Sequence, residues 1–333
     1  MTSILTNFAA NTALLNLQNT VKSLQDTQNQ ISTGLRISSA ADNAAYFAIS
    51  TVLRSDSGAL STVSDSLALG AASLDVATNA LSKIQTTLAD IKQALLSAAT
   101  PGVDRDKIQA QIAQDQAQLK NIASSANFNG QNLLSVNSDT AVNASYNASQ
   151  VFISSYSRDS SGNVTVGTIG VDTTKTALFD ANTAATPRGF LDTADTTTQG
   201  TYYDANGTAH VGTVDGKSVV TIDIGTGTGG AAIDDTTTKQ QLLAAYTQMV
   251  DKAISSVTGA ASAIGAARSR ISQQQSFISS LKTSIDDGVG AMVDADLNTV
   301  STRLQALQVQ QQLGVQSLSI ANQSTQAILK LFQ

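Results

Sequence analysis

Apolar residues recur at alternating steps of three and four between residues 243 and 285. The series is Leu243, Tyr246, Val250, Ala253, Val257, Ala260, Ile264, Ala267, Ile271, Gln274, Ile278, Leu281 and Ile285, and only Gln274 breaks it. A 3.5-residue repeat held this long predicts one helix with a narrow apolar seam. At about 1.5 Å per residue the helix would be roughly 60 Å long, and it needs an equally long partner.

A second series of the same kind, between residues 46 and 95, predicts that partner. It runs through Tyr46, Ile49, Leu53, Asp56, Leu60, Val63, Leu67, Gly70, Leu74, Ala77, Leu81, Ile84, Leu88, Ile91 and Leu95, and only Asp56 and Gly70 interrupt it. Pro101 and Gly102 would end this helix, because proline lacks an amide donor and glycine permits a turn. A shorter helix capped by Asp104 should follow, ending near Asn127–Gly130.

Two weaker seams lie near the ends of the chain and predict terminal helices that pair with each other. The first is Leu14, Leu17, Val21, Leu24, Gln28, Ile31 and Leu35, and the second is Leu297, Val300, Leu304, Leu307, Gln311, Gly314, Leu318, Ala321, Thr325, Ile328 and Phe332. Helices so polar and so poor in charge are marginal alone, and we expect their seams to contact other copies as well. Small residues at Ser38–Asp42, with Asp42 as a cap, and at Asp286–Gly290 predict joints.

The hydrophobic period changes after about Leu133 and predicts a small β-rich insert. Strands are expected at 151–153, 164–166 and 211–224. Asp215-Gly216 predicts a hairpin turn within the last of these, and Asn206-Gly207 predicts another turn. The fold class expected is therefore mainly α: elongated, nested antiparallel helical pairs with a coiled-coil-like seam and a small β-rich central insert.

Composition narrows the function further. Residues 136–236 hold 11 aspartates against four basic residues, a net charge of −7, whereas the whole chain carries −6. Neither the insert nor the flanks have the basic face that nucleic acid requires, so no nucleic-acid partner is expected. No apolar run approaches a membrane span, so no membrane insertion is expected. The start of the chain carries no positive charge before Lys22 and does not resemble a conventional signal peptide.

Candidate chemistry is weak, and no catalytic residue, cofactor or metal is expected. The chain has no cysteine and a single histidine, His210. Asp294 and Asp296 are better explained as helix caps than as a cation site, because two carboxylates without further ligands are a poor site. The glycine-rich stretch 225–230 lacks the lysine and the strand–loop–helix frame of a phosphate loop. An enzyme needs positioned acids, bases or metals at recognisable spacing.

Several motifs resemble those of bacterial flagellins. Residues 31–45, ISTGLRISSAADNAA, are similar to the family's LSSGLRINSAADDAA stretch, and Phe128-Asn-Gly130 before Leu133-Leu134 is similar to its FNG…LL turn. Residues 264–270, IGAARSR, resemble LGAxQNR, and Asp294-Ala-Asp296 with Ser319-Ile-Ala-Asn322 resembles the terminal DAD…LAQAN helix. The resemblance covers about residues 1–135 and 236–333, whereas the insert carries none.

The resemblance implies a subunit that polymerises into the filament of the bacterial flagellum and gives motility. It implies terminal helices at 1–40 and 289–333 forming an inner tube, shell helices at 41–135 and 237–288, and a variable surface insert at 136–236. It also implies an extracellular location without a cleaved signal peptide, export through the type III apparatus with an export chaperone, and contacts with filament cap and hook-junction proteins. A hook–filament junction protein, or a filament subunit with an adhesive insert, are the alternatives.

Two sets of residues carry these functional expectations. Polymerisation is assigned to the terminal seams and to Arg36: Leu14, Leu17, Val21, Leu24, Ile31, Leu35, Arg36, Leu297, Val300, Leu304, Leu307, Leu318, Ile328 and Phe332. The segment that resembles the contact region for the innate flagellin receptor contains Leu88, Asp90, Ile91 and Lys92. Receptor-activating flagellins carry two arginines in this segment where this chain has Asp90 and Lys92, and reversing a charge predicts weak recognition.

Overall fold

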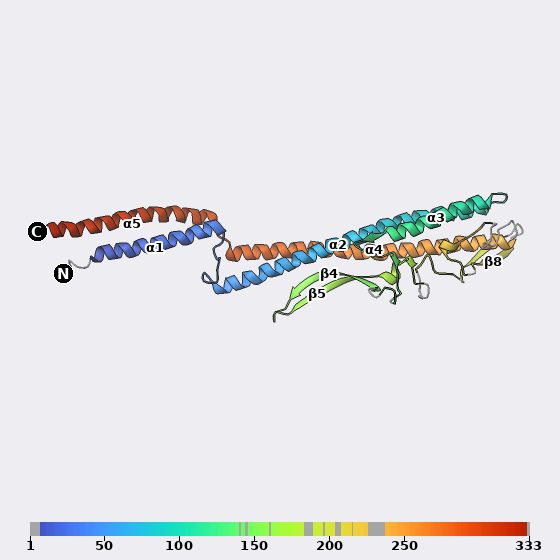
Figure 1. The fold of residues 1–333 in the computed structure, drawn as a ribbon, viewed down its shortest axis with the longest axis horizontal. Helices are drawn as coiled ribbons and strands as arrows, with labels where there is room; N and C mark the ends of the chain where they lie inside the picture. Colours follow the sequence, from blue (N-terminus) through green and yellow to red (C-terminus); the bar gives the residue numbers. More distant parts are fainter. Residues whose placement is uncertain are drawn as a thin grey trace. The chain divides into compact units, whose positions relative to one another are not determined.

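A computed structural model describes residues 7–139, 141–143, 146–159, 161–182, 189–195, 197–203, 208–214, 216–225 and 237–331. The chain divides into two compact units, Leu60–Ser279 and Met1–Ala59 with Ser280–Gln333. The helices are α1 (Phe8–Thr33), α2 (Ala44–Ala98), α3 (Arg105–Ser125), α4 (Thr237–Val293) and α5 (Leu297–Leu331), and Figure 1 labels them along the chain. Both α2 and α4 run from one unit into the other, and each unit is described by itself.

The core of the Leu60–Ser279 unit is the seam between α2 and α4, with α3 beside α2 (Figure 1). The predicted apolar positions of α2 from Leu60 to Leu95 are all buried, as are those of α4 from Leu243 to Ile271 and Ile278. Two ion pairs flank the seam: Lys92 Nζ lies 2.6 Å from Asp251 Oδ1, and Arg268 Nε lies 2.8 Å from Asp75 Oδ1. The 3.5-residue repeat therefore identified this part of the core correctly.

Helix α3 begins and ends where the sequence predicts. The Asp104 side chain accepts a hydrogen bond from the Lys107 amide, which satisfies a free N–H at the helix start. Gly102 has a φ of 81°, a left-handed conformation that turns the chain between α2 and α3. Ile112 and Leu119 are fully buried on the inner side of α3. The chain then enters a tight hairpin of β1 (Asn127–Phe128) and β2 (Gln131–Asn132) around Asn129-Gly130.

The insert consists of short two-stranded sheets. Antiparallel pairs are formed by β4 (Ser149–Arg158) with β5 (Val164–Asp172) and by β7 (Gln199–Tyr203) with β8 (Ala209–Thr213). The pair of β3 (Ser135–Val136) and β6 (Phe179–Asp180) is parallel. The strands expected at 151–153 and 164–166 are therefore confirmed, and each is longer than predicted.

The hairpin expected around Asp215-Gly216 is wrong. Strand β8 pairs with β7, and Val219–Thr221 forms a 3₁₀ turn, η2, instead of a strand. The cause is local: the Ser218 amide donates to the Thr221 hydroxyl, and Gln116 of α3 donates to the carbonyls of Val219 and Ile222, each at 3.0 Å. These bonds occupy the backbone groups that a strand ladder would use. The Asn206-Gly207 turn and residues 226–230 of the glycine-rich stretch lie outside the described residues.

In the unit of residues 1–59 and 280–333, α1 and α5 lie side by side as an antiparallel pair (Figure 1). The joint expected at Asp286–Gly290 is wrong, because α4 continues to Val293. Asp286 accepts a hydrogen bond from the Ser57 hydroxyl at 2.9 Å, and Val289 and Val293 are buried with Ile37. This packing stabilises a last helical stretch that its aspartates and glycines do not favour by themselves.

Candidate functional site

Helices α1 and α5 face each other along a seam. The α1 side of the seam consists mostly of small and polar residues. Ala10, Ala13, Leu17, Thr20, Leu24 and Thr27 of α1 are half-buried or buried at alternating steps of three and four. On α5 the half-buried or buried positions are Val300, Leu304, Leu307, Gln311, Gly314, Leu318 and Ala321, the phase that the sequence predicts. Leu17 packs over Gly314, where an added Cβ would lie 3.2 Å from Leu17 Cδ1.

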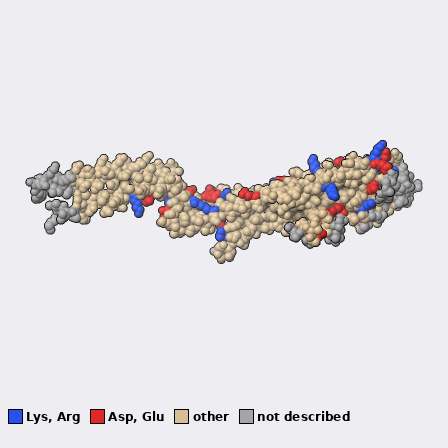
Figure 2. All heavy atoms as spheres, in the orientation of Figure 1, with Lys and Arg blue, Asp and Glu red and all other residues tan. Residues whose placement is uncertain are grey.

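Both helices also carry exposed apolar side chains outside the seam. Leu15 on α1 is 60% exposed, and Ile320 on α5 is 67% exposed. Phe8 on α1 and Val309, Leu313 and Val315 on α5 are exposed as well. On the face drawn in Figure 2, charged side chains are sparse over α1 and α5. An apolar, weakly charged surface on both sides of a helix pair is typical of a surface that another protein covers.

The residues assigned to polymerisation differ in how exposed their side chains are. Leu17, Val21, Leu24, Val300, Leu304 and Leu318 are half-buried and Leu307 is buried, whereas Leu14, Ile31, Arg36 and Leu297 are exposed. Leu35 lies beyond the end of α1 and forms a β-bridge with Asp294. The Ile328 side chain and Phe332 lie outside the described residues. The phase predicted for α1 is thus partly wrong, since Thr20 and Thr27 face α5 while Leu14 does not.

An open groove of ≈ 740 Å³ runs along one side of the α1–α5 pair. Its lining is mostly small or aliphatic: Ala9, Thr12, Ala13, Asn16, Leu313, Gly314, Ser317, Ile320 and Ala321. It contains no titratable side chain, so it offers packing surface and not acid–base chemistry.

The ends of α1 and α4 meet in a short clasp, which we define as Gly34–Ile37 with Met292–Ala295. The Arg36 amide donates to the Val293 carbonyl at 2.7 Å, and the Ala295 amide donates to the Gly34 carbonyl at 2.9 Å. The Arg36 guanidinium donates from Nη2 to the Met292 carbonyl at 2.8 Å. A cationic group at the last carbonyls of a helix satisfies free acceptors and matches the helix dipole.

Aspartate and asparagine side chains close the turns on either side of the clasp. Backbone hydrogen bonds from Ser39 and Ser38 lower the pKa of Asp42, which closes its turn but does not cap α2 as expected. That cap is Asn43, whose Oδ1 accepts from the Ala45 and Tyr46 amides. Asp296 caps α5 as predicted, and hydrogen bonds from the Thr299 hydroxyl and the Asn298 amide lower its pKa.

The predicted receptor segment lies on α2 against α4. Leu88 and Ile91 are fully buried in the α2–α4 core, so they are not available to a partner that binds the folded surface. Asp90 is exposed, and Lys92 is held by its ion pair with Asp251. Of the four residues assigned, only the two polar ones lie at the surface.

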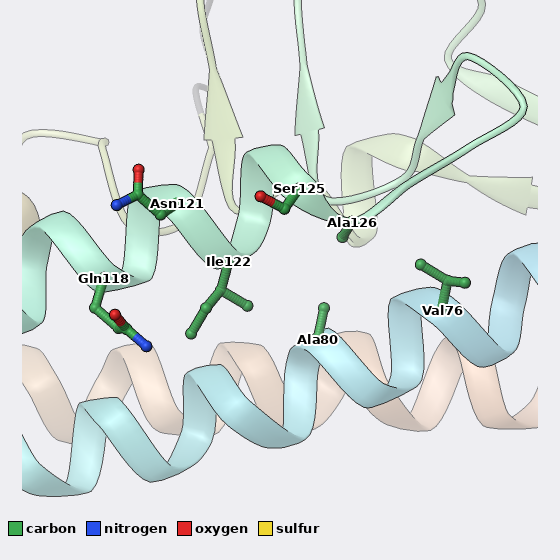
Figure 3. Close-up of a pocket in the computed structure, with 7 residues that line it drawn as sticks. All are labelled: Val76, Ala80, Gln118, Asn121, Ile122, Ser125 and Ala126. Carbon is green, nitrogen blue, oxygen red and sulfur yellow. The ribbon is translucent and has the colours of Figure 1, made fainter.

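A second groove, of ≈ 360 Å³, lies between α2 and α3. Figure 3 shows Val76 and Ala80 of α2 facing Gln118 and Ile122 of α3, while Asn121 points away.

Across the described ranges, no three His or Asp side chains gather closely enough to hold a metal ion. Nor does any helix in those ranges combine the length and the hydropathy needed to span a membrane.

Comparison with known proteins identifies the family of this chain. The bacterial flagellin N-terminal helical region matches residues 4–139, and the bacterial flagellin C-terminal helical region matches residues 247–332. Flagellin C of Rhizobium meliloti (strain 1021) is 44% identical over all of both chains. This chain belongs to the bacterial flagellin family.

Other relatives agree with this assignment. The flagellin of Brucella melitensis biotype 1 is 41% identical over the full length of both chains. A solved structure of FliC from Burkholderia pseudomallei aligns with 60% of this chain and 99% of that chain, at 16% identity and a TM-score of 0.32, which is too low to support any statement on the fold. The names of these relatives favour the filament subunit over a hook–filament junction protein.

The flagellin is therefore a structural subunit that polymerises into the extracellular filament of the bacterial flagellum, which serves motility. Its mainly helical fold with a small β-rich insert is the one that the sequence predicts. Sequence reasoning missed Ile37, Asn43 and Val293 at the joint. The signal that could have found them is the family motifs: Ile37 and Asn43 lie within residues 31–45, and Val293 directly precedes residues 294–296.

Proposed function

We propose that this flagellin polymerises through the outward faces of α1 and α5. The observation that carries the proposal is that both helices expose apolar side chains outside their shared seam: Leu15 and Val309, and also Leu313 and Ile320, which line the open groove. Contacts between copies would remove this apolar surface from water, at about 25 cal/mol per Å². The seam residues Leu17, Leu24 and Leu307 then act indirectly, by holding the two helices together.

The test is a charge placed in the outward face. Leu313→Asp should abolish seeded polymerisation of the full-length protein, because an unpaired carboxylate would be buried at the contact. Gln310→Asp adds the same charge at an exposed polar position of α5 and should polymerise, with at most a modest delay. Normal filaments from Leu313→Asp would show that assembly uses another surface.

We further propose that the subunit is exported through the flagellar type III apparatus with an export chaperone, and that it contacts cap and hook-junction proteins. The chain is compatible with threading in an unfolded state, since it has no cysteine and no disulfide has to survive passage. A marginally stable α1–α5 pair would order late, so that surface for assembly forms outside the cell. A pull-down of the export chaperone by the full chain, lost on deletion of α5, tests the chaperone contact.

We infer that the chain has no enzymatic role. Its sequence offers no nucleophile–base set, and the two grooves described above are lined mainly by small, apolar and amide side chains. We also propose weak recognition by the innate flagellin receptor. The support is chemical: Asp90 is exposed and acidic where activating flagellins carry arginine, and Lys92 is engaged with Asp251.

A further inference from the structure

Two contacts between α1 and α5 depend on the register of the helices: Leu17 packs over Gly314, and the Asn7 side chain donates from Nδ2 to the Ala321 carbonyl at 3.0 Å. The rest of the α1 side is less specific, because a slip of one heptad exchanges Ala13 for Thr20, Leu17 for Leu24 and Thr20 for Thr27. The charged residues Lys22, Asp26 and Arg303 are exposed and so do not lie in the seam. Helix pairs often fix their register with a buried polar or charged group. The hydroxyls of Thr20 and Thr27 donate to carbonyls of their own helix and therefore add nothing of this kind.

The clasp gives the two helices a common starting point. Gly34 closes α1 with a left-handed φ of 71°, and its carbonyl accepts from Ala295, two residues before α5 begins. Leu17 lies 17 positions before Gly34, and Gly314 lies 17 positions after Leu297. At about 1.5 Å per residue, Leu17 and Gly314 each lie about 25 Å from the clasp end of their helix. Equal distances from the clasp bring the two residues together, and in the structure Leu17 packs over Gly314.

The clasp is also anchored. Ile37 is 8% exposed and packs with Val289 and Val293, and partly buried Leu35, Phe47, Leu53, Ile285 and Met292 surround this cluster. Arg36 contributes two bonds to α4, one from its amide to Val293 and one from its guanidinium to Met292. The Arg36 side chain thus ties the end of α1 to the last carbonyls of α4, directly before the residues that lead into α5.

We propose that the clasp sets the register of α1 against α5, and that Arg36 is a positioning residue for filament assembly. The second part rests on the proposed function, because the register decides how the outward residues of the two helices are arranged. The clasp joins segments about 250 residues apart, so it closes only when both ends of the chain are present. Until then α1 has neither its partner nor its register.

Disulfide trapping tests this directly, because the chain contains no cysteine of its own. Leu17→Cys with Gly314→Cys reports the observed register, since the Leu17 Cα lies 4.0 Å from a Cβ built at Gly314. Leu17→Cys with Leu307→Cys, or with Ala321→Cys, reports a slip of one heptad in either direction. Oxidation is performed on full-length monomers and on seeded filaments, and non-reducing gels separate bonds within one chain from bonds between chains.

Each cysteine pair is placed in the otherwise unmodified chain and in Arg54→Ala, a control at an exposed position of α2. In both, only the 17–314 pair should cross-link within a chain. Arg36→Ala should lower the preference for 17–314 over the slipped pairs about tenfold, which is the scale of one hydrogen bond from a charged group. Gly34→Val, which strains a left-handed residue, should do the same through the backbone. Arg36→Lys should restore part of the preference.

Clasp variants that still cross-link only the 17–314 pair, with undiminished yield, would overturn the proposal. So would a parent chain that cross-links no pair in either state, since no registered helix pair would then exist. Sedimentation of the same samples separates the two claims. If Leu313→Asp polymerises normally while Arg36→Ala loses the register, the proposed assembly surface is wrong and the role of the clasp is supported. If Leu313→Asp stays monomeric while Arg36→Ala keeps the register, the assembly surface is supported and the role of the clasp is wrong.

Discussion

The aromatic ring of Phe152 lies against the backbone of Gly70, so that a Cβ added at Gly70 would be only 2.7 Å from Phe152 Cδ1. Gly70 sits in the middle of α2, where a glycine costs about 0.5–1 kcal/mol relative to alanine. It is also one of the two residues that interrupt the apolar series of α2. The interruption has a structural reason: it makes room for the β4–β5 hairpin to pack on the helix.

Gly70→Ala should therefore destabilise the chain by about 1–3 kcal/mol, because the hairpin must shift to admit one methyl group. Gly259→Ala is the matched control, since a Cβ at Gly259 of α4 meets nothing within 4 Å and should stabilise by about 0.5–1 kcal/mol. Urea unfolding of both variants measures the difference. Equal stabilisation by the two substitutions would show that Phe152 does not occupy this position.

A second glycine fixes the β7–β8 hairpin against α4. A Cβ at Gly200 would overlap the Ala245 amide nitrogen, and backbone atoms cannot move aside as a side chain can. Gly200→Ala should cost about 3 kcal/mol and release β7 from the helix. Hydrogen exchange should then accelerate in β7 and β8 but not in β4 and β5. Unchanged exchange in all four strands would contradict the close approach.

Acid should weaken the same region through Asp195. Partial burial raises the pKa of Asp195, but hydrogen bonds from Thr198 and Thr197 outweigh it and lower the pKa to about 2. A carboxyl whose pKa is lower in the folded chain stabilises it above the unfolded value of 3.8, and this contribution is lost as the pH falls toward 2. The loss should amount to about 2 kcal/mol.

Asp195→Asn removes the titration, so its stability relative to the parent should rise as the pH falls from about 5 to about 2. Asp26→Asn, at an exposed position of α1, is the control. Urea unfolding across this pH range provides the measurement. A difference between parent and Asp195→Asn that stays constant with pH would refute the assignment.

The sequence predicted those parts of the fold in which the chain buries large aliphatic side chains against itself. Leu67, Leu74 and Leu81 of α2 repeat at every seventh position, and all three are fully buried. The same reasoning gave the wrong phase for part of α1, where Thr20 and Thr27 face α5 and Leu15 points away. Hydropathy does not distinguish a residue that the chain buries from one left for another copy.

The joint shows a different limit. Asp286, Asp287 and Gly288 favour an interruption locally, yet α4 continues because Ser57 satisfies Asp286 and Val293 packs on Ile37. These contacts join residues more than 200 positions apart, and a local pattern carries no information about them. The sequence singled out Arg36, but it did not predict the partners of the clasp, which are joined mainly by backbone hydrogen bonds that any residue type can make.

The receptor hypothesis can be tested on the surface of α2. Asp90→Arg should raise activation of cells that report on the innate flagellin receptor by roughly tenfold, because it restores a positive, bidentate donor at an exposed position. Asp65→Arg makes the same change at another exposed position of α2 and should have no effect. Strong activation by the unmodified monomer would refute weak recognition.

The most direct test is polymerisation of the purified chain beside a version that lacks residues 1–38 and 294–333. The deletion removes α1, α5 and all of the clasp except Met292 and Val293. Sedimentation and electron microscopy after seeding give the readout. We expect long filaments from the full chain and only soluble subunits from the shortened one. Filaments built by the shortened chain would show that assembly does not depend on the terminal helices.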